Sequence, residues 1–259
     1  MLSIRSISVN YGETEIIRDV SFNVESGEVV SLIGPNGAGK TTMIRAISGV
    51  IPLRSGSVHV VSGDLSALSI TQRARLLAVV PQARRLPPAY SVQQAVLMGR
   101  TPYLGWLGNP SKNDYEKVKW ALDRTQITEL TERRVEELSG GEQQLVLVAR
   151  ALAQDAPVVL LDEPTAHLDL QHQATILDLV RTLAQERNLA VLMSMHDLNL
   201  VSLYSDRIAL IGDGCLHAFG TPKEVLNPQL LSDIYQVPLH VIPHPHQDIP
   251  LVLLNGHKD

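Results

Sequence analysis

The stretch LIGPNGAGKTT, residues 32–42, decides the fold of this chain. It overlaps the end of an apolar run at residues 29–33 that predicts a buried strand, and a helix is expected to begin at Lys40. Gly34, Gly39, Lys40 and Thr41 fit the spacing G-x-x-x-x-G-K-[ST]. Glycines leave backbone N–H groups facing inward, the lysine reaches terminal phosphates, and the threonine hydroxyl can serve Mg²⁺. The stretch therefore predicts a phosphate-binding loop, with a ligand-free strand-to-helix turn as the alternative.

Composition limits the class of protein. The chain has 259 residues, 44% hydrophobic and 19% charged, which suits one large α/β domain or a domain with a smaller annex. A formal net charge of -5 offers no broad basic surface, so nucleic acid is not an expected partner. No apolar run in the sequence approaches the ~18 residues of a membrane span. The single cysteine, Cys215, excludes an internal disulfide and fits a reducing compartment. These features predict a cytoplasmic protein without direct membrane insertion.

The order of the expected elements indicates an α/β fold with an insertion. Residues 2–24 are strand-rich, and strands at 158–161, 189–195 and 207–211 later alternate with a helix at 170–187 and a short one after Asp197. This alternation predicts a mostly parallel central sheet covered on both sides. Residues 83–155, which contain proline-punctuated helical stretches, are interpreted as an inserted helical subdomain. We expect one domain at residues 1–236 and a tail at residues 237–259.

Two carboxylates end one of the expected strands. The segment VVLLDE, residues 158–163, is an apolar run that leads into Asp162 and Glu163. Side chains alternate along a strand, so the two acids point in different directions. One can hold Mg²⁺ through water while the other faces an attacking water. The alternative is a pair of solvated acids at a loop, but the position after a buried strand favours hydrolysis, in which phosphate is passed to water.

A second glycine pair stands at the start of another expected helix. Ser139, Gly140, Gly141 and Glu142 precede an apolar stripe, so free backbone N–H groups are expected there. These groups could form a second anion cradle. Alone, the motif could equally be an ordinary capped helix start.

Together, GPNGAGKTT, VVLLDE and LSGGEQ resemble the nucleotide-binding subunit of an ABC transporter, and the resemblance covers residues 2–235. It implies a P-loop NTPase fold of the ABC ATPase type. In that fold, an N-terminal antiparallel β-subdomain and an inserted helical subdomain accompany a mostly parallel central sheet. It also implies ATP hydrolysis coupled to transport, with ATP and Mg²⁺ as ligands.

The same resemblance implies the site residues. Three catalytic side chains are expected: Glu163 as the base, His196 at the γ-phosphate and Gln82 at the attacking water. Mg²⁺ is expected at Thr41, Gln82 and Asp162. Tyr11 is expected to stack on adenine, although plain core packing is its alternative. The remaining ATP contacts are expected from Gly34, Asn36, Gly37, Gly39, Lys40, Thr41 and Thr42.

Contacts between two subunits are also implied. Ser139, Gly140, Gly141 and Glu142 would meet the ATP of a partner subunit, and Asp169 would communicate between the subunits. The partners are therefore a second copy of the chain in an ATP-dependent homodimer, two transmembrane permease subunits and, indirectly, a substrate-binding protein. The permeases are expected against the helical subdomain near Gln82. The chain would then lie peripherally on the inner face of the cell membrane.

Three segments resemble one importer branch, which serves iron-siderophore, haem and cobalamin uptake: residues 97–108, residues 195–210 and residues 220–237. The alternatives are an importer of molybdate or another metal, an exporter, a non-transport ABC ATPase, and a regulatory module that holds ATP without hydrolysing it. Intact Glu163 and His196 argue against the regulatory module. The tail histidines, His240, His244, His246 and His257, have a spacing that fits no tetrahedral metal site, so a solvated tail is expected.

Overall fold

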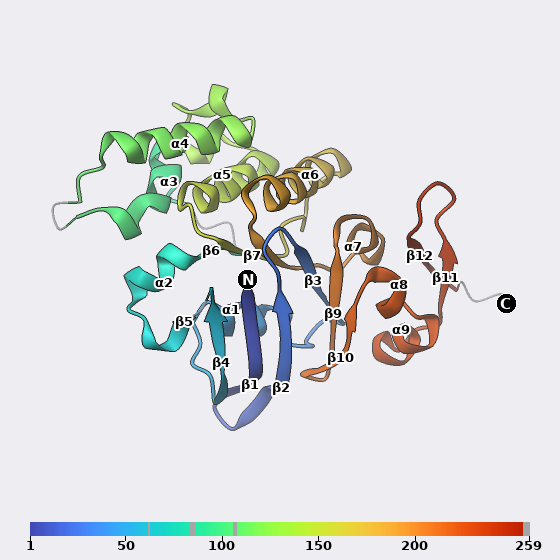
Figure 1. Cartoon of the computed structure of the whole chain (residues 1–259). Helices are drawn as coiled ribbons and strands as arrows, with labels where there is room; N and C mark the ends of the chain where they lie inside the picture. The colour runs from blue at the N-terminus through green and yellow to red at the C-terminus, as the bar shows by residue number, and fades with distance from the viewer. Residues whose placement is uncertain (62, 83–85, 106–107, 256–259) are drawn as a thin grey trace.

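The computed structural model describes residues 1–61, 63–82, 86–105 and 108–255. A small N-terminal sheet, a central sheet and a layer of helices lie one above another in Figure 1, and a C-terminal hairpin projects at the side. Within the part of the chain that is described, no helix combines the length and apolar character needed to cross a membrane.

The central sheet has six strands in the order β10-β9-β3-β8-β7-β6. Every pairing from β9 to β6 is parallel, and only β10 runs antiparallel to its neighbour. All residues of β3, β7 and β8 are buried, as expected for strands covered on both faces. The predicted sheet is confirmed. The strands are β3 (Val29–Ile33), β6 (Leu77–Val80), β7 (Val158–Asp162), β8 (Ala190–Ser194), β9 (Arg207–Gly212) and β10 (Cys215–Gly220).

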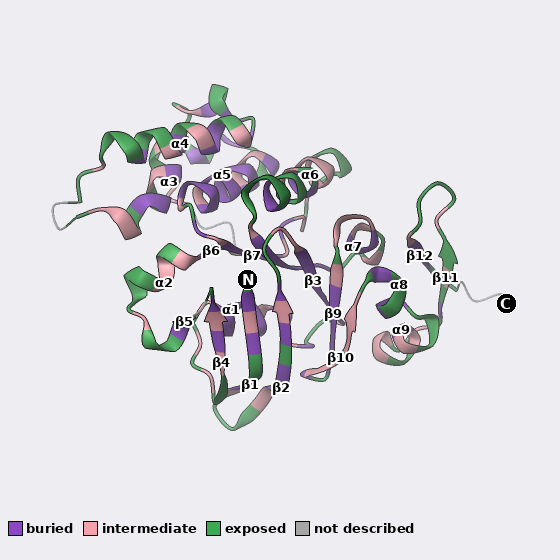
Figure 2. Cartoon of the chain, viewed as in Figure 1, coloured by how far each residue is buried: buried purple, intermediate pink, exposed green. Residues whose placement is uncertain are grey.

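A second, four-stranded antiparallel sheet has the order β2-β1-β4-β5. Its buried side chains, such as Leu2, Ile7 and Val58, share a core with Val30 and Leu32 of β3. Figure 2 shows buried, intermediate and exposed segments along β1 and β2. The members are β1 (Leu2–Tyr11), β2 (Thr14–Val24), β4 (Ser55–Val60) and β5 (Gly63–Asp64), with α1 (Lys40–Ile47) against β1 and β2 and with η1 (Leu65–Ala67) and α2 (Ile70–Leu76) after β5.

The helical layer surrounds α5, which contacts α3, α4 and β6. Because neighbours cover it on several sides, most of α5 is buried. Arg100 of η2 is 3% exposed and connects α4 to α5. Its Nε lies 2.9 Å from Oδ1 of Asp114, and its Nη1 donates to the Ala153 carbonyl at 2.8 Å. The layer consists of α3 (Val92–Leu97), η2 (Met98–Tyr103), α4 (Lys112–Arg124), η3 (Thr128–Leu130), η4 (Val135–Glu137) and α5 (Gly140–Ala153).

The C-terminal third returns to the central sheet. Helix α6 (Leu170–Arg187) buries one apolar stripe, as its periodicity predicts: Ile176, Leu177, Val180, Leu183 and Ala184. The later elements are α7 (Leu198–Tyr204), α8 (Pro222–Val225), α9 (Pro228–Tyr235), β11 (Leu239–Pro243) and β12 (Pro250–Leu254).

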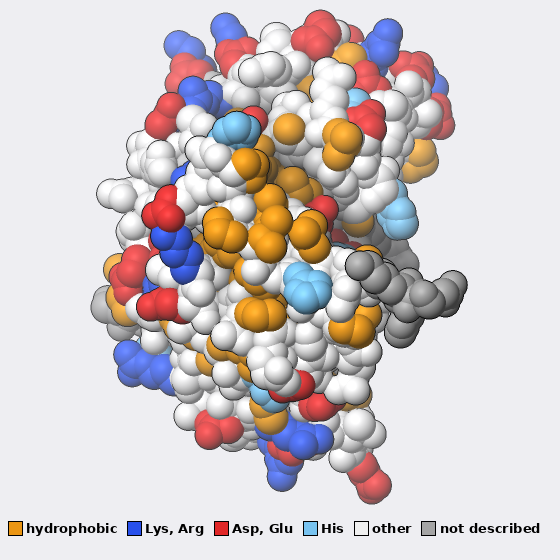
Figure 3. Space-filling model, turned by 90° about the vertical axis from the view of Figure 1, so that its right-hand side faces the viewer, with side chains coloured by type: hydrophobic (Ala, Val, Ile, Leu, Met, Phe, Trp, Pro, Cys, Tyr) orange, Lys and Arg blue, Asp and Glu red, His pale blue; other side chains and the backbone are white. Residues whose placement is uncertain are grey.

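Residues 239–254 are an ordered part of the fold, because β11 and β12 form an antiparallel hairpin that packs on α7. The tail histidines His240 and His246 are exposed, as expected. The Asn199 side chain donates to the Val252 carbonyl at 3.1 Å and accepts the Val252 N–H at 2.8 Å, so it acts as a neighbouring strand would. The Ser202 hydroxyl donates to the Pro250 carbonyl at 2.7 Å. Figure 3 views this side of the molecule, where hydrophobic side chains gather. His257 lies outside the described residues.

Candidate functional site

The loop at residues 34–39 joins β3 to α1, as the glycine pattern predicts. A Cβ atom on Gly34 would overlap the carbonyl oxygen of Ile211 on β9, so only glycine fits there. Gly39 is the N-cap of α1 at φ 100°, a left-handed conformation that favours glycine, and it brings no side chain to cap the helix. The first N–H groups of α1 therefore stay available to an anion.

Lys40 folds back into this loop. It is 5% exposed, and its Nζ donates to the carbonyl oxygens of Gly34 at 2.7 Å and Pro35 at 3.1 Å. Burial lowers the pKa of Lys40, while the carboxylates of Glu163 and Asp162 oppose that shift. An ammonium group held in this way, beside an open helix start, can meet the negative charge of a polyphosphate.

Asp162 ends β7 beside the first turn of α1. Its Oδ1 accepts hydrogen bonds from Thr41 Oγ1 at 3.1 Å and from Ser194 Oγ at 2.7 Å, and the residue is 4% exposed. Mg²⁺ in nucleotide sites is usually held by one or two carboxylates together with phosphate oxygens and waters. One buried carboxylate next to a threonine hydroxyl fits that ligand set.

Glu163 points to a different set of partners. Gln82 Nε2 donates to its Oε2 at 2.6 Å, and Nε2 of His196 contacts its Oε1. The Glu163 side chain is 12% exposed and that of His196 is 45% exposed. Glu163 also has φ 49°, an uncommon conformation for a residue with a side chain, which is often found where function constrains the backbone. The structure thus brings together three residues that lie far apart in the sequence.

Ser194 is a site residue that the sequence reasoning missed. Its hydroxyl is fully buried, accepts the Glu163 N–H at 2.9 Å and donates to Oδ1 of Asp162 at 2.7 Å. It therefore fixes the two neighbouring acids relative to each other. A hydroxyl in the otherwise apolar strand AVLMS, two residues before His196, was the available signal.

The second glycine pair lies at the start of α5, as predicted. Ser139 is the N-cap: its hydroxyl accepts the Glu142 N–H at 3.3 Å, and Oε2 of Glu142 accepts the Ser139 N–H at 2.7 Å. This capping box satisfies the ordinary interpretation of the motif. Ser139 and Gly140 are nevertheless exposed at the helix end, so an anion can still reach it. Glu142 acts here as a cap.

The other predicted residues take varied positions. Tyr11 is 47% exposed at the end of β1, so core packing is wrong for it and its ring is accessible to a planar ligand. Asn36 and Gly37 are exposed in the loop, and Thr42 is partly exposed. Asp169 is the N-cap of α6, where its Oδ1 accepts the His172 N–H at 2.8 Å.

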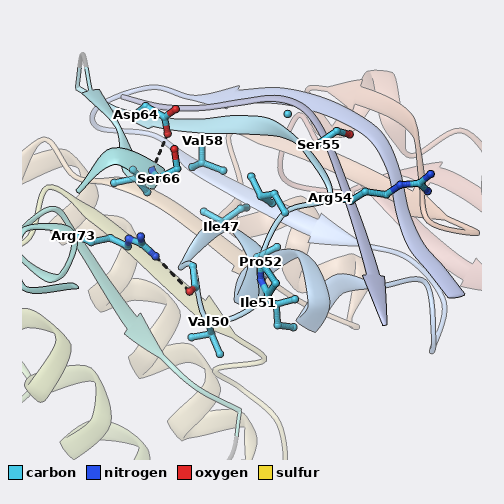
Figure 4. A pocket seen from close by; sticks show the side chains of 15 residues that line it. Ile47, Val50, Ile51, Pro52, Arg54, Ser55, Val58, Asp64, Ser66 and Arg73 are labelled. Atoms are coloured by element: carbon cyan, nitrogen blue, oxygen red, sulfur yellow. Dashed lines mark hydrogen bonds between the residues drawn. The ribbon is translucent and has the colours of Figure 1, made fainter. Parts of the chain in front are cut away.

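A pocket of about 470 Å³ lies at the opposite end of α1 from Lys40. Figure 4 shows Ile47, Val50 and Pro52 on its apolar side and Arg73 of α2 reaching toward it. Nη1 of Arg73 donates to the Gly49 carbonyl at 3.3 Å. The pocket is thus separate from the phosphate loop and lies between the end of α1 and α2.

Comparison with known proteins shows the family to which the chain belongs. The family model described as ABC transporter matches residues 17–166. A petrobactin import ATP-binding protein of Bacillus anthracis is 36% identical over 98% of this chain and 93% of its own length. A hemin import ATP-binding protein of Thermobifida fusca is 38% identical over 98% of this chain and 88% of its own length.

Solved structures agree with these relatives. An inward-facing conformation of a metal-chelate type ABC transporter gives a TM-score of 0.86 at 28% identity, over 98% of this chain and 97% of that one. A dimeric bacterial ABC transporter cassette gives 0.75 at 27% identity, over 85% of this chain and 98% of that one. The predicted fold and family are confirmed. The chain therefore belongs to the ABC transporter family, as an ATP-binding subunit that hydrolyses ATP.

Proposed function

We propose that this ATPase powers import of an iron chelate, a ferric siderophore or haem, or of cobalamin, through two separate permease subunits. The observation that carries the ATPase part is the grouping of Lys40, Asp162 and Glu163 at one edge of the central sheet. Support for the cargo class comes from the petrobactin and hemin import proteins, which match this chain along almost its whole length.

Hydrolysis would use the described groups in order. The phosphates of ATP bind at the start of α1, where Lys40 turns its ammonium from the loop carbonyls to the terminal phosphates. Mg²⁺ near Thr41, Asp162 and Gln82 would neutralise charge on the β- and γ-phosphates. Glu163 acts as the base once it exchanges the amide of Gln82 for the attacking water. His196, already against Glu163, holds the γ-phosphate.

The working unit would be a homodimer. Helix α1 packs on β1, β2, β7 and β8, whereas α5 belongs to the helical layer. In the arrangement that the family resemblance implies, the two cradles of one chain serve different ATP molecules. Each ATP lies between one chain's Lys40 loop and residues 139–141 of its partner, which makes ATP part of the interface. The likeness to a dimeric cassette supports this arrangement.

Permease contact is proposed for the segment from Gln82 to residue 108, at the entry to an inserted subdomain proposed for residues 83–155 of the 1–236 domain. Met98, at 41% exposed, is an apolar side chain within this segment, and the exposed Val50 and Ile70, at 74% and 84%, are added to the proposed surface. Helix α2 connects them, because Arg73 binds Gly49 beside the pocket and Nε of Arg75 donates to the Pro102 carbonyl at 3.0 Å. Docked there, the chain lies on the inner face of the membrane.

Two measurements test this function. Co-purification from native membranes should recover two permease subunits, and uptake of a labelled ferric siderophore, haem or cobalamin should depend on the chain. Recovery of a molybdate or other metal permease, or of an exporter, would overturn the cargo class, and absence of any membrane partner would indicate a non-transport ATPase. Hydrogen exchange on the complex should protect residues 86–105; protection confined to residues 237–255 would overturn the docking surface.

A further inference from the structure

The imidazole of His172 lies between the start of α6 and the start of α5. Its Nδ1 is 2.7 Å from Oδ1 of Asp169, the same oxygen that accepts the His172 backbone N–H at 2.8 Å. The ring also lies against Gly141, where an added Cβ atom would be only 2.7 Å from Nε2 and 2.8 Å from Cγ of His172. The ring therefore fills the space that any side chain at residue 141 would need.

The two contacts use different parts of the ring. A carboxylate only accepts hydrogen bonds, so Nδ1 donates to Asp169 and the Cδ2–Nε2 edge is left for Gly141. The backbone N–H of His172, followed by its side chain, lowers the pKa of Asp169. Asp169 is thus held as a charged cap at α6. Gly141 is the second residue of α5 and is buried, so the ring packs against the backbone at the start of that helix.

We propose that His172 is a positioning residue that holds Asp169 and the α5 start in one fixed arrangement, so that the α5 start meets the partner's ATP while Asp169 meets the partner subunit. This inference rests on the proposed homodimer, in which residues 139–141 of one chain face the ATP of the other and Asp169 communicates between the two chains. If the α5 start moves by about 1 Å, its N–H groups lose their alignment with the γ-phosphate, and the rate of hydrolysis falls. His172 acts through these segments without touching the nucleotide.

Two substitutions separate the contacts. His172→Asn keeps a donor near the position of Nδ1 but removes the ring edge from Gly141. His172→Phe keeps a ring beside Gly141 but removes the donor to Asp169. His172 can position the two segments only if it keeps both contacts. His172→Asn and His172→Phe should therefore each lower kcat for ATP hydrolysis roughly tenfold, as much as His172→Ala. The affinity of the single chain for ATP, set at the Lys40 loop, and the Tm should stay at parental values.

Gly141→Ala tests the contact between the His172 ring and α5 by changing the α5 residue. The new methyl group displaces the ring, so kcat should again fall. In the double variant Gly141→Ala/His172→Ala the clash is gone, and its kcat should be no lower than that of the worse single variant. A double-variant loss equal to the product of the two single losses would show independent effects and overturn the link.

Control variants separate the outcomes. His59→Ala, on β4 in the N-terminal sheet, should keep the parental kcat. Ser139→Arg, which fills the proposed cradle, should be inactive while still binding ATP; if it hydrolyses ATP at the parental rate, the dimer of the proposed function is wrong. If Ser139→Arg is inactive but any of the three His172 variants keeps the parental kcat, only the role of His172 is overturned. A kcat loss fully explained by unfolded protein in thermal melts would overturn it too.

Discussion

The side-chain amide of Gln82 donates a 2.6 Å hydrogen bond to Oε2 of Glu163, which joins the chain entering the helical layer to the acid at the end of β7. The bond is possible because β6 and β7 are parallel neighbours, so the residues that follow them meet at one edge of the sheet. A movement of the helical layer can therefore change the surroundings of Glu163 directly.

Gln82→Ala should lower kcat for ATP hydrolysis by roughly tenfold or more, because the water near Glu163 loses a group that orients it. ATP affinity should change little, since the phosphate loop is untouched. Steady-state kinetics together with equilibrium nucleotide binding measure the two effects. A variant with weaker ATP binding but the parental kcat would contradict the role given to Gln82.

Lys40→Ala should abolish ATP binding. The ammonium is held within the loop by its hydrogen bonds to the Gly34 and Pro35 carbonyls, and the proposed mechanism turns it from there to the terminal phosphates. Filter binding with labelled ATP measures the loss. Arg45→Ala, at an exposed position on the last turn of the same helix, is the matched control and should bind ATP normally. Unchanged affinity in Lys40→Ala would rule out the loop as the nucleotide site.

Ser194→Ala should affect both stability and rate. It leaves the partly buried Glu163 N–H without its hydroxyl acceptor, which costs about 1 kcal/mol in the free energy of unfolding. It also frees Asp162 and Glu163 from each other, so kcat should fall in the folded protein. Urea unfolding and ATPase assays test the two parts, with Ser48→Ala at a helix end as the control. Parental values in both assays would show that Ser194 fixes neither acid.

Asp114→Asn should destabilise the helical layer by about 3 kcal/mol, because it breaks a buried pair with Arg100. Hydrogen bonds from the Ser111 side chain, then from Arg100, hold the pKa of Asp114 below its usual value. The carboxylate therefore stabilises the fold above about pH 4 and loses that contribution as the pH falls through its lowered pKa. Acid unfolding should show this component in the parent and not in Asp114→Asn; identical pH profiles would contradict it.

Much of the fold followed from local sequence patterns. The helix start at Lys40 and the 170–187 helix were predictable because glycine punctuation and a repeated apolar stripe act within one segment. Short elements were not. Helix α2 has no buried residue and so carries no apolar stripe, and the β11–β12 hairpin depends on Asn199, which lies more than fifty residues before Val252.

The site residues also fall into those that local sequence patterns predict and those that they do not. Lys40, Asp162, Glu163 and Ser139 stand in motifs that can be found by spacing. The contacts among Gln82, Glu163 and His196 arise from strand order, which no spacing encodes, and only the family resemblance pointed to them. Ser194 and His172 belong to no recognised motif, because their roles come from which neighbours the fold places around them.

The most direct test of the account uses Glu163→Gln. The amide keeps the size and some hydrogen bonding of the carboxylate but cannot accept a proton, so ATP hydrolysis should slow by roughly a hundredfold or more. ATP binding should survive, and since ATP joins the two chains until it is hydrolysed, the variant should elute as a dimer in size-exclusion chromatography with ATP and Mg²⁺ but not with ADP. Turnover at near-parental rates, or a monomer that still binds ATP, would contradict the catalytic role of Glu163 or the dimer itself.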